Sequence, residues 1–453
     1  MDTILYIPDL VVIGGGLAGS EAAWQAAQRG LSVRLYEMRP EVTTGAHKTG
    51  LLAELVCSNS LGSKLPDRAA GVLKEELRRM GSMLLECAEA SALPAGRALA
   101  VDRDLFARLV SEKIEAHPKI EVVREERTEI PTGLAIIASG PLTSEKLSDS
   151  IAALTGKSHL FFFDAIAPIV KLDSINFKTA FRGSRYEKSE DEAGDYINCP
   201  FTKEEYEAFV TALRSAERIP LRAFEGEIDA GVRAGSDQFF EGCLPVEVAA
   251  QRSENALAFG PLRPTGLFDP HINRRPYAVV QLRQDNLAGD LYNLVGFQTN
   301  LSFTDQQKIF RMIPGLEKAE FVRYGQMHRN TYMSSPAVLR PTLQFHNRDD
   351  LLFAGQIIGI EGYAGNIASG LIAGWNASRI FAGQPPLILP RTTLTGALCH
   401  YVTHAELKDF QPMKANFGIL PPLESIKRMS RRARAQACTQ RALADLESFL
   451  SQI

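Results

Sequence analysis

A glycine pattern near the start of the chain has the residue types needed to bind the phosphates of a dinucleotide. Gly14, Gly16 and Gly19 form a G-x-G-x-x-G pattern, and Glu37 follows 18 residues after the last glycine. The first glycine permits a tight turn, the second lets the backbone approach a pyrophosphate, and the third lets helix and strand pack closely. A helix N-terminus then offers N–H groups to the phosphates, and the carboxylate accepts hydrogen bonds from the ribose. The predicted cofactor residues are Gly14, Gly15, Gly16, Leu17, Ala18, Gly19, Glu37 and Arg39.

A second glycine-rich segment favours FAD over NAD as the dinucleotide. It lies over 300 residues later, and a helix of small residues follows it. A flavin needs a second strand–turn–helix unit whose helix N-terminus reaches the ring or the ribityl chain. The alternative is a core helix that merely tolerates glycine. The residues predicted to contact FAD here are Gly355, Gln356, Gly362 and Tyr363.

Local patterns predict the elements that position these residues. The glycine pattern lies between a β-branched run at 9–14 and a helix over 17–29, and a second strand ends at Glu37. One long helix is predicted over 71–90, where apolar residues recur with a period close to 3.6, and residues 38–66 are expected to be a loop. Further along, the patterns predict a helix over 102–116 and strands over 121–126 and 134–140.

The middle of the chain has a different pattern from its two ends. Strand-like runs separated by polar segments predict an antiparallel sheet, with strands at 158–172, 240–249, 275–284 and 291–300. After residue 330 the strand–turn–helix pattern of the first residues recurs, with a strand predicted over 350–359 and a helix over 366–382. The tail from about 403 is expected to be largely helical. The predicted fold class is α/β, with a Rossmann-type FAD-binding domain from both chain ends and an inserted α+β substrate domain. The expected boundaries are 1–100 and 330–453, with strands from 120–141, for the first domain and 142–329 for the second.

Composition and charge exclude several classes of protein. The 453 residues carry 50 Lys and Arg against 53 Asp and Glu, a formal charge of −3, and 45 % are hydrophobic, so a disordered chain is excluded. No general positive charge favours nucleic acid, so an RNA partner needs a local basic patch. The six cysteines include no C-x-x-C pair, which predicts thiols in a reducing compartment and no metal site. Without a signal peptide or a charge-free apolar run of about 20 residues, the chain is expected to be cytoplasmic and not membrane-bound.

Several longer segments resemble one family. They include IGGGLAGSEAAWQAA (13–27), LVCSNSL (55–61), PAGRALAVDRDLFA (94–107), FEGCLPVEV (240–248), GQMHRNTY (325–332) and AGQIIGIEGY (354–363). Together they resemble the folate- and FAD-dependent tRNA (uracil-5-)-methyltransferases, the TrmFO family, which are relatives of the GidA-type flavoproteins. The resemblance covers almost the whole chain. One departure is visible, because Gly365-Asn366 stand where the family typically has Glu-Ser, and this affects the contact between that turn and the flavin.

The resemblance implies transfer of a one-carbon unit from 5,10-methylenetetrahydrofolate to carbon-5 of the T-loop uridine, position 54, of tRNA, which forms 5-methyluridine. Reduced FAD supplies the electrons and NADH or NADPH regenerates it. Carbon-5 of uracil is a poor nucleophile, and addition of a thiolate to carbon-6 makes it reactive. Cys57 and Cys243 match the family's two functional cysteines. Cys243 is assigned to attack on carbon-6, and Cys57 to removal of the carbon-5 proton or protection of the one-carbon adduct, although the two roles are interchangeable on sequence grounds.

Basic residues mark three places where folate carboxylates or RNA phosphates could bind. The first is a stretch with His271, Arg274, Arg275 and Arg283, and the second is His328 and Arg329. The third is a cluster on a predicted C-terminal helix, with Lys427, Arg428, Arg431, Arg432 and Arg434. Spacings of three and four place several of its charges on one helix face. In each place the alternative is an ordinary solvated surface.

Two other functions remain open at this stage. One is a related enzyme that acts on ribosomal RNA or on the tRNA wobble uridine, although GidA-type chains are longer than this one. The other is a small-molecule FAD oxidoreductase, which would not require the two motif cysteines. The oligomeric state is not predicted.

Overall fold

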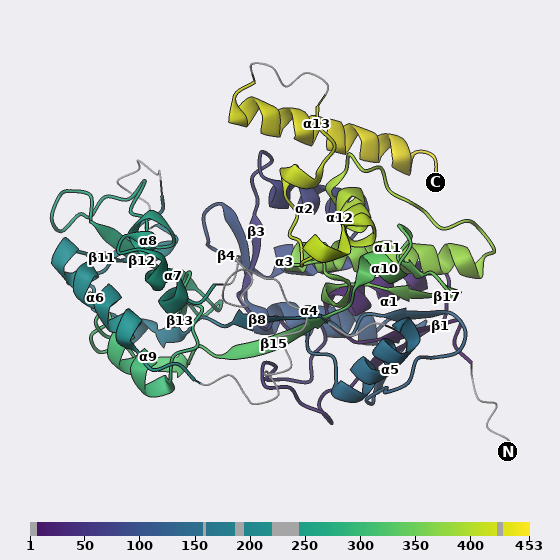
Figure 1. Ribbon diagram of the computed structural model, residues 1–453, viewed down its shortest axis with the longest axis horizontal. Helices are drawn as coiled ribbons and strands as arrows, with labels where there is room; N and C mark the ends of the chain where they lie inside the picture. The colour runs from purple at the N-terminus through teal and green to yellow at the C-terminus, as the bar shows by residue number, and fades with distance from the viewer. Residues whose placement is uncertain (1–6, 157–159, 186–193, 220–243, 424–428) are drawn as a thin grey trace.

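The computed structural model describes residues 7–156, 160–185, 194–219, 244–423 and 429–453, and it has two lobes (Figure 1). The first lobe contains both ends of the chain, and the second contains much of its middle. Each lobe has its own large cluster of buried apolar side chains. Among the described residues no helix is long and apolar enough to cross a membrane.

A six-stranded sheet forms the centre of the first lobe. Its strand order is β16-β17-β7-β1-β2-β6, and only the pairing of β16 with β17 is antiparallel. The strands are β1 (Leu10–Ile13), β2 (Val33–Glu37), β6 (Ile120–Arg124), β7 (Ala135–Ile137), β16 (Gln344–Phe345) and β17 (Arg348–Phe353). Strands β1 and β7 and the last three residues of β17 are apolar, because both faces of a parallel sheet are covered. The pairing of β17 with β7 joins the two ends of the chain in one sheet.

Two helices of small residues also join the chain ends. Helix α1 (Leu17–Gln28) packs against α11 (Tyr363–Phe381). A Cβ atom at Gly370 would overlap the carbonyl oxygen of Ala18, and one at Gly374 would lie 2.5 Å from that of Ala22. The glycines of α11 therefore permit the close approach of the two backbones. Gly355 lies beside the start of α1, where a Cβ atom on it would lie 2.8 Å from that of Ala18.

The long helix predicted over 71–90 is wrong, because the structure has two helices there, α2 (Ala69–Arg79) and α3 (Met83–Ala90). Gly81 has a φ of +73°, and Ser82 caps α3 by accepting a hydrogen bond from the N–H of Leu85 at 3.2 Å. The apolar period continues across the break, so periodicity alone does not reveal it. Residues 38–66 are not wholly loop either, since β3 (Ser60–Ser63) pairs with β5 (Ala98–Val101), which pairs with β4 (Ala92–Leu93).

The remaining helices of the first lobe surround the sheet and its edges. Helix α4 is as predicted, and Asp102 caps it by accepting from the N–H of Leu105 at 2.9 Å. The tail is less helical than expected, because 405–423 contain only short 3-10 turns. The bounds are α4 (Arg103–Glu115), α5 (Glu145–Thr155), α10 (Ser335–Val338), α12 (Leu394–His404) and α13 (Arg431–Leu450).

The second lobe contains the antiparallel sheet that the sequence predicts, with strand order β10-β11-β12-β13-β9-β14. The strands are β9 (Ile169–Lys171), β10 (Phe181–Arg182), β11 (Tyr196–Phe201), β12 (Ala278–Gln284), β13 (Leu291–Leu294) and β14 (Phe321–Arg323). Four helices accompany the sheet, α6 (Lys203–Ser215), α7 (Val246–Arg252), α8 (Ala256–Phe259) and α9 (Phe303–Phe310). Of the strand predicted over 240–249, residues 240–243 lie outside the described residues, and the prediction is wrong from residue 246, where α7 begins after Pro245. Proline suits this position because its missing N–H is not needed at a helix start.

Two paired strands connect the lobes. Strand β8 (Leu160–Ala165) and β15 (Met327–Tyr332) run antiparallel between them (Figure 1). The strand predicted over 158–172 is therefore divided into β8 and β9, and 158–159 lie outside the described residues. The polypeptide enters and leaves the second lobe through this pair, which places β15 beside the cavities described next.

Candidate functional site

A cavity of about 950 Å³ lies at the carboxyl ends of β1, β2 and β7. Its position is typical of nucleotide sites in parallel sheets. Both ends of the chain contribute to its wall. The predicted cofactor residues that line it are Gly14, Gly16, Leu17, Ala18, Glu37, Arg39, Gly355, Gln356 and Tyr363.

The three motif glycines have the separate roles that the sequence predicts. Gly14 has a φ of +102°, and a Cβ atom there would lie 2.5 Å from the carbonyl oxygen of Ala138. A Cβ atom at Gly19 would overlap the carbonyl oxygen of Gly14. At Gly16 a Cβ atom would meet no atom within 4 Å, although the residue lines the cavity. Gly16 therefore leaves open the space that a pyrophosphate needs beside the start of α1.

Three predicted cofactor residues do not line this cavity. Gly15 lies behind the turn, where its N–H donates to Oε2 of Glu37 at 3.0 Å. Gly19 supports the turn from within the helix, as its contact with Gly14 shows. Gly362 lines the neighbouring cavity described below.

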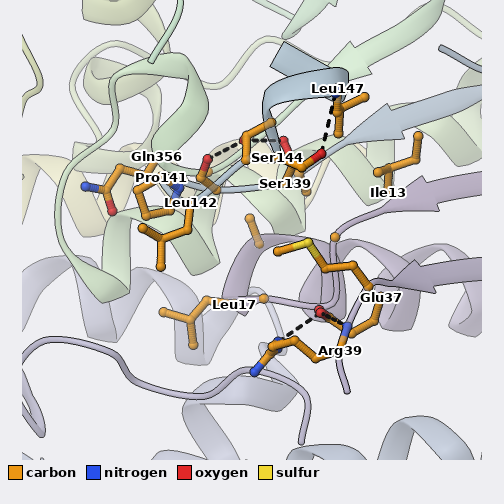
Figure 2. A pocket seen from close by; sticks show the side chains of 18 of the residues that line it. Ile13, Leu17, Glu37, Arg39, Ser139, Pro141, Leu142, Ser144, Leu147 and Gln356 are labelled. Carbon is orange, nitrogen blue, oxygen red and sulfur yellow. Dashed lines mark hydrogen bonds and ion pairs between the residues drawn. The ribbon is translucent and has the colours of Figure 1, made fainter. Parts of the chain in front are cut away.

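Glu37 is buried and ionised in the wall of the cavity. Its Oε1 accepts hydrogen bonds from the N–H and Nε of Arg39, at 3.0 and 2.9 Å. Arg39 also forms an ion pair with Glu54 at 3.2 Å. Burial opposes ionisation, but the hydrogen bonds and positive charge of Arg39 outweigh it and lower the pKa of Glu37. Figure 2 shows the pair on one side of the pocket and Ser139, Ser144 and Leu147 on the other.

The opposite wall was not predicted from sequence as a cofactor site. It runs from Ser139 to Ser144, where the side chain of Ser144 caps α5. Asn366 was also missed, although it lines the cavity. Two sequence features could have indicated these residues. One is the Gly140-Pro141 turn after a predicted strand, and the other is Gly365-Asn366, where the sequence departs from the family pattern. A Cβ atom at Gly365 would lie 2.8 Å from Cγ2 of Ile360, so a larger residue there requires that side chain to move.

A second cavity of about 1050 Å³ adjoins the first. The two share Val56, Pro141, Gln356 and Tyr363 in their walls. The second cavity is also lined by Cys57, Gln298, Asn330 and Glu361, which come from four separate segments of the chain. A ligand in one cavity can therefore touch a ligand in the other, beside a thiol.

The Cys57 loop is held from the C-terminal half of the chain. The N–H of Cys57 donates to the phenol oxygen of Tyr363 at 2.9 Å, and that hydroxyl donates to the carbonyl of Ser58 at 2.9 Å. The side chain of Cys57 is half-buried. Cys243 lies outside the described residues, whereas Leu244 directly follows it in the described part.

The other four cysteines are buried, as expected for inert core thiols. Burial raises the pKa of Cys87 to about 11 and that of Cys399 to about 12. It raises the pKa of Cys199 still further. A thiol with such a pKa is a poor nucleophile at neutral pH, which leaves Cys57 as the half-buried thiol among the described residues.

The basic stretch of the second lobe is divided by the structure. Arg274, Arg275 and His271 are exposed and line a cavity of about 1760 Å³. Arg283 lies at the other end of β12, where it is 8 % exposed and donates to Asn59 at 2.9 Å and to Asn293 at 3.3 Å. Burial lowers the pKa of Arg283. The structure therefore does not place Arg283 in the exposed patch with its sequence neighbours.

The other predicted RNA residues are described only in part. Arg431, Arg432 and Arg434 are exposed in the first turn of α13, whereas Lys427 and Arg428 lie outside the described residues. His328 and Arg329 are on β15, but their side chains are outside the described part. In the ranges that the structure describes, no group of three or more His, Cys, Asp or Glu residues could hold a metal ion.

Comparison with known proteins supports one family along almost the whole chain. The family model described as glucose inhibited division protein A matches residues 9–385. The chain is 53 % identical to the methylenetetrahydrofolate--tRNA-(uracil-5-)-methyltransferase TrmFO of Pelotomaculum thermopropionicum, over 97 % of this chain and 98 % of that protein. It is 54 % identical to the protein of the same name in Symbiobacterium thermophilum, over 98 % and 97 %. The solved structure of Aquifex aeolicus GidA superposes with a TM-score of 0.67 at 17 % identity, over 98 % of this chain and 74 % of that one, and so shares the fold.

Proposed function

Because this chain belongs to the GidA family and, within it, to the TrmFO methylenetetrahydrofolate--tRNA-(uracil-5-)-methyltransferases, we propose that it forms 5-methyluridine at position 54 in the T-loop of tRNA. The carbon donor is 5,10-methylenetetrahydrofolate and the flavin is FAD. The structural observation that carries the proposal is the shared wall of the two cavities, with Cys57 lining one and the dinucleotide glycines lining the other.

The residues of the first cavity fit FAD. Gly16 leaves room for a pyrophosphate, and the ionised Glu37 is placed to accept from ribose hydroxyls. Asn366 has a buried Oδ1 that lacks a hydrogen-bond partner within the described chain, which a donor on the ligand would satisfy. Bound FAD supplies the electron pair that completes the methyl group, and NADH or NADPH restores the reduced state.

The steps on uracil need a thiolate and a base. A thiolate adds to carbon-6 so that carbon-5 becomes nucleophilic, and a base then removes the carbon-5 proton. We assign the first role to Cys243 and the second to Cys57, with the exchange of roles as the alternative. Tyr363 hydrogen-bonds to the backbone N–H of Cys57 and to the carbonyl of Ser58, so it fixes the loop that carries the thiol.

We propose a FAD-binding domain of residues 1–100 and 330–453, with strands from 120–141, and an inserted substrate domain of 142–329. The separate apolar cores and the shared parallel sheet support a division into two domains. Helix α5, which follows the proposed boundary at 142, packs with the core of the first lobe. Arg274 and Arg275 on the second lobe and Arg431 on α13 are proposed to contact tRNA phosphates. An enzyme that acts on tRNA is also expected in the cytoplasm.

The test is an assay with labelled 5,10-methylenetetrahydrofolate, NADPH and unmodified tRNA, followed by nucleoside analysis. We expect labelled 5-methyluridine at position 54, and no product from Cys243→Ala although FAD stays bound. Label in ribosomal RNA but not in tRNA would favour the related RNA methyltransferase. A yellow protein that oxidises NADPH but labels no RNA would favour the small-molecule oxidoreductase.

A further inference from the structure

Asn330 is a buried residue whose side-chain oxygen has no hydrogen-bond partner in the described part of the chain. It lies on β15, is 1 % exposed and lines the second cavity together with Cys57. A buried acceptor left without a partner costs about 1–3 kcal/mol. A ligand in the cavity that hydrogen-bonds to the carboxamide would recover this free energy.

The other two carboxamides of the cavity are less available. Gln356 already donates from Nε2 to Glu361 at 2.8 Å. Gln298 is only partly buried. Its backbone carbonyl accepts from the N–H of Val246 at 2.7 Å. That contact places Gln298 beside the segment that follows Cys243. Asn330 is therefore the carboxamide of this cavity that is both fully buried and unsatisfied.

A carboxamide offers an acceptor oxygen beside two N–H donors. Its complement is a lactam edge, in which a ring N–H stands next to a carbonyl. Both uracil and the pterin of a folate present this edge at N3 and O4. Carbon-6 of uracil lies across the ring from N3, so the thiolate that adds to carbon-6 approaches the side of the ring opposite the lactam edge. Asn330 and Cys57, which is assigned to the carbon-5 proton, both line this cavity.

We propose that Asn330 binds the lactam edge of the target uracil, accepting from N3–H and donating to O4. This inference rests on the proposed function and names a residue for the recognition of its substrate. The donated hydrogen bond also assists the chemistry. When the thiolate forms the S–C6 bond, the C5=C6 π pair moves between C4 and C5, and the C4=O4 π pair moves onto O4. An N–H aimed at O4 stabilises the charge that develops there, as donors in an oxyanion hole do.

The charge on O4 is transient, so the effect falls on the rate and not only on binding. When carbon-5 attacks the one-carbon electrophile, the electron pair returns from O4 to the carbonyl. Loss of the carbon-5 proton to the base and cleavage of the S–C6 bond then restore the thiolate. Asn330 neither gains nor loses a proton in this sequence. A hydrogen bond that strengthens as charge develops raises kcat more than it lowers KM.

The test compares Asn330→Asp with the unsubstituted protein and with Asn347→Asp, which makes the same change at an exposed position. The aspartate has the same shape but lacks the N–H that donates to O4. The first readout is the covalent adduct between the protein and tRNA that carries 5-fluorouridine at position 54. This substrate traps the carbon-6 adduct, because fluorine does not leave carbon-5 as a cation. We expect Asn330→Asp to form the adduct about 10²–10³-fold more slowly, with unchanged FAD content and urea midpoint, and Asn347→Asp to match the unsubstituted protein.

A second readout separates uracil from pterin. Binding of 5,10-methylenetetrahydrofolate is measured by equilibrium dialysis without tRNA, and we expect the same Kd for all three proteins. A folate Kd that weakens in Asn330→Asp while adduct formation stays normal would assign Asn330 to the pterin and overturn the proposal. If Asn330→Asp fails to fold, Asn330→Ala serves in its place, because it removes the N–H donor without adding another. Absence of any adduct with the unsubstituted protein would refute the proposed function itself.

Discussion

Nη2 of Arg103 lies 3.1 Å from Oδ1 of Asp285, which joins the two lobes through a buried ion pair. Arg103 begins α4 in the first lobe, and Asp285 directly follows β12 in the second. Nη1 of the same guanidinium donates to the carbonyl of Cys57 at 3.0 Å. Burial opposes the charge on Arg103, but Asp285 outweighs it and raises the pKa of Arg103. The contact between the lobes and the position of the Cys57 loop therefore depend on one ionised side chain.

Asp285→Asn should destabilise the protein and slow methylation, because it leaves a buried guanidinium without a counter-charge. Removal of one partner from a buried pair costs about 3–5 kcal/mol. The free energy of unfolding in urea should fall by this order, and methylation should slow as the Cys57 loop loses its support. The control is Lys171→Gln, which breaks an exposed pair with Glu320 in the second lobe and should cost less than about 1 kcal/mol. Equal losses of unfolding free energy in Asp285→Asn and Lys171→Gln would contradict the stabilising role of the buried pair between Arg103 and Asp285.

Gly16→Ala should weaken FAD binding without unfolding the protein. A Cβ atom at this position meets no protein atom within 4 Å and extends into the space assigned to the pyrophosphate. We expect the Kd of FAD, measured by flavin fluorescence, to rise at least about tenfold, the equivalent of roughly 1.4 kcal/mol. Gly45→Ala is the matched control, because its Cβ atom also meets no neighbour but the residue is exposed. An unchanged Kd for Gly16→Ala would place the pyrophosphate elsewhere.

The strand–turn–helix units of the first lobe could be predicted from sequence because their signals are local. The close packing of Gly19 on Gly14 and the cap of α4 at Asp102 each join residues only a few positions apart. Contacts between distant segments could not be predicted in this way. The hydrogen bonds of Tyr363 to the Cys57 loop cross more than 300 residues. Without a family resemblance, no local pattern connects these two segments.

Burial accounts for most of the errors at the level of residues. Arg283 is predicted as a surface contact because arginine is seldom buried. In the structure it is buried, and its guanidinium donates hydrogen bonds to Asn59 and Asn293. The helix predicted over 71–90 fails because a capped break at Gly81 preserves the apolar period. Segment 246–249 is β-branched but helical, since Pro245 permits a helix start and packing in the second lobe outweighs strand propensity.

The stability of the first lobe should depend on pH through Glu76. Its carboxylate accepts from the N–H groups of Leu394 and Thr395 at 2.7 and 2.9 Å and thereby joins α2 to α12. Burial raises the pKa of Glu76 from 4.5 to about 7, against the opposing effect of these hydrogen bonds. A raised pKa means that its stabilising contribution is complete below pH 4.5 and is lost as the pH rises through about 7.

The free energy of unfolding should therefore fall by a few kcal/mol between about pH 4.5 and 7.5 through this group, at about 1.4 kcal/mol per pKa unit. Urea titrations across this range measure the slope. Glu76→Gln cannot ionise, so its slope should be smaller than that of the unsubstituted protein. Glu112→Gln, at an exposed position on α4, should leave the slope unchanged. If the free energy of unfolding had the same slope against pH in Glu76→Gln and in the unsubstituted protein, the raised pKa of Glu76 would be contradicted.

The double variant Arg274→Ala/Arg275→Ala should weaken tRNA binding and reduce its dependence on salt. Both side chains are exposed beside the cavity at the end of β12, so each is available to one phosphate. The slope of log Kd against log salt should fall by about 0.7–0.9 for every phosphate that the variant no longer neutralises. Because the cysteine cavity lies at the other end of β12, kcat at saturating tRNA should stay within about twofold. The control is Lys146→Ala, which removes a positive charge from an exposed position on α5. It should change neither the Kd of tRNA nor the slope of log Kd against log salt. Equal slopes for the double variant and the unsubstituted protein would show that this patch is solvated surface, and Arg431→Ala would then test α13 as the contact with RNA.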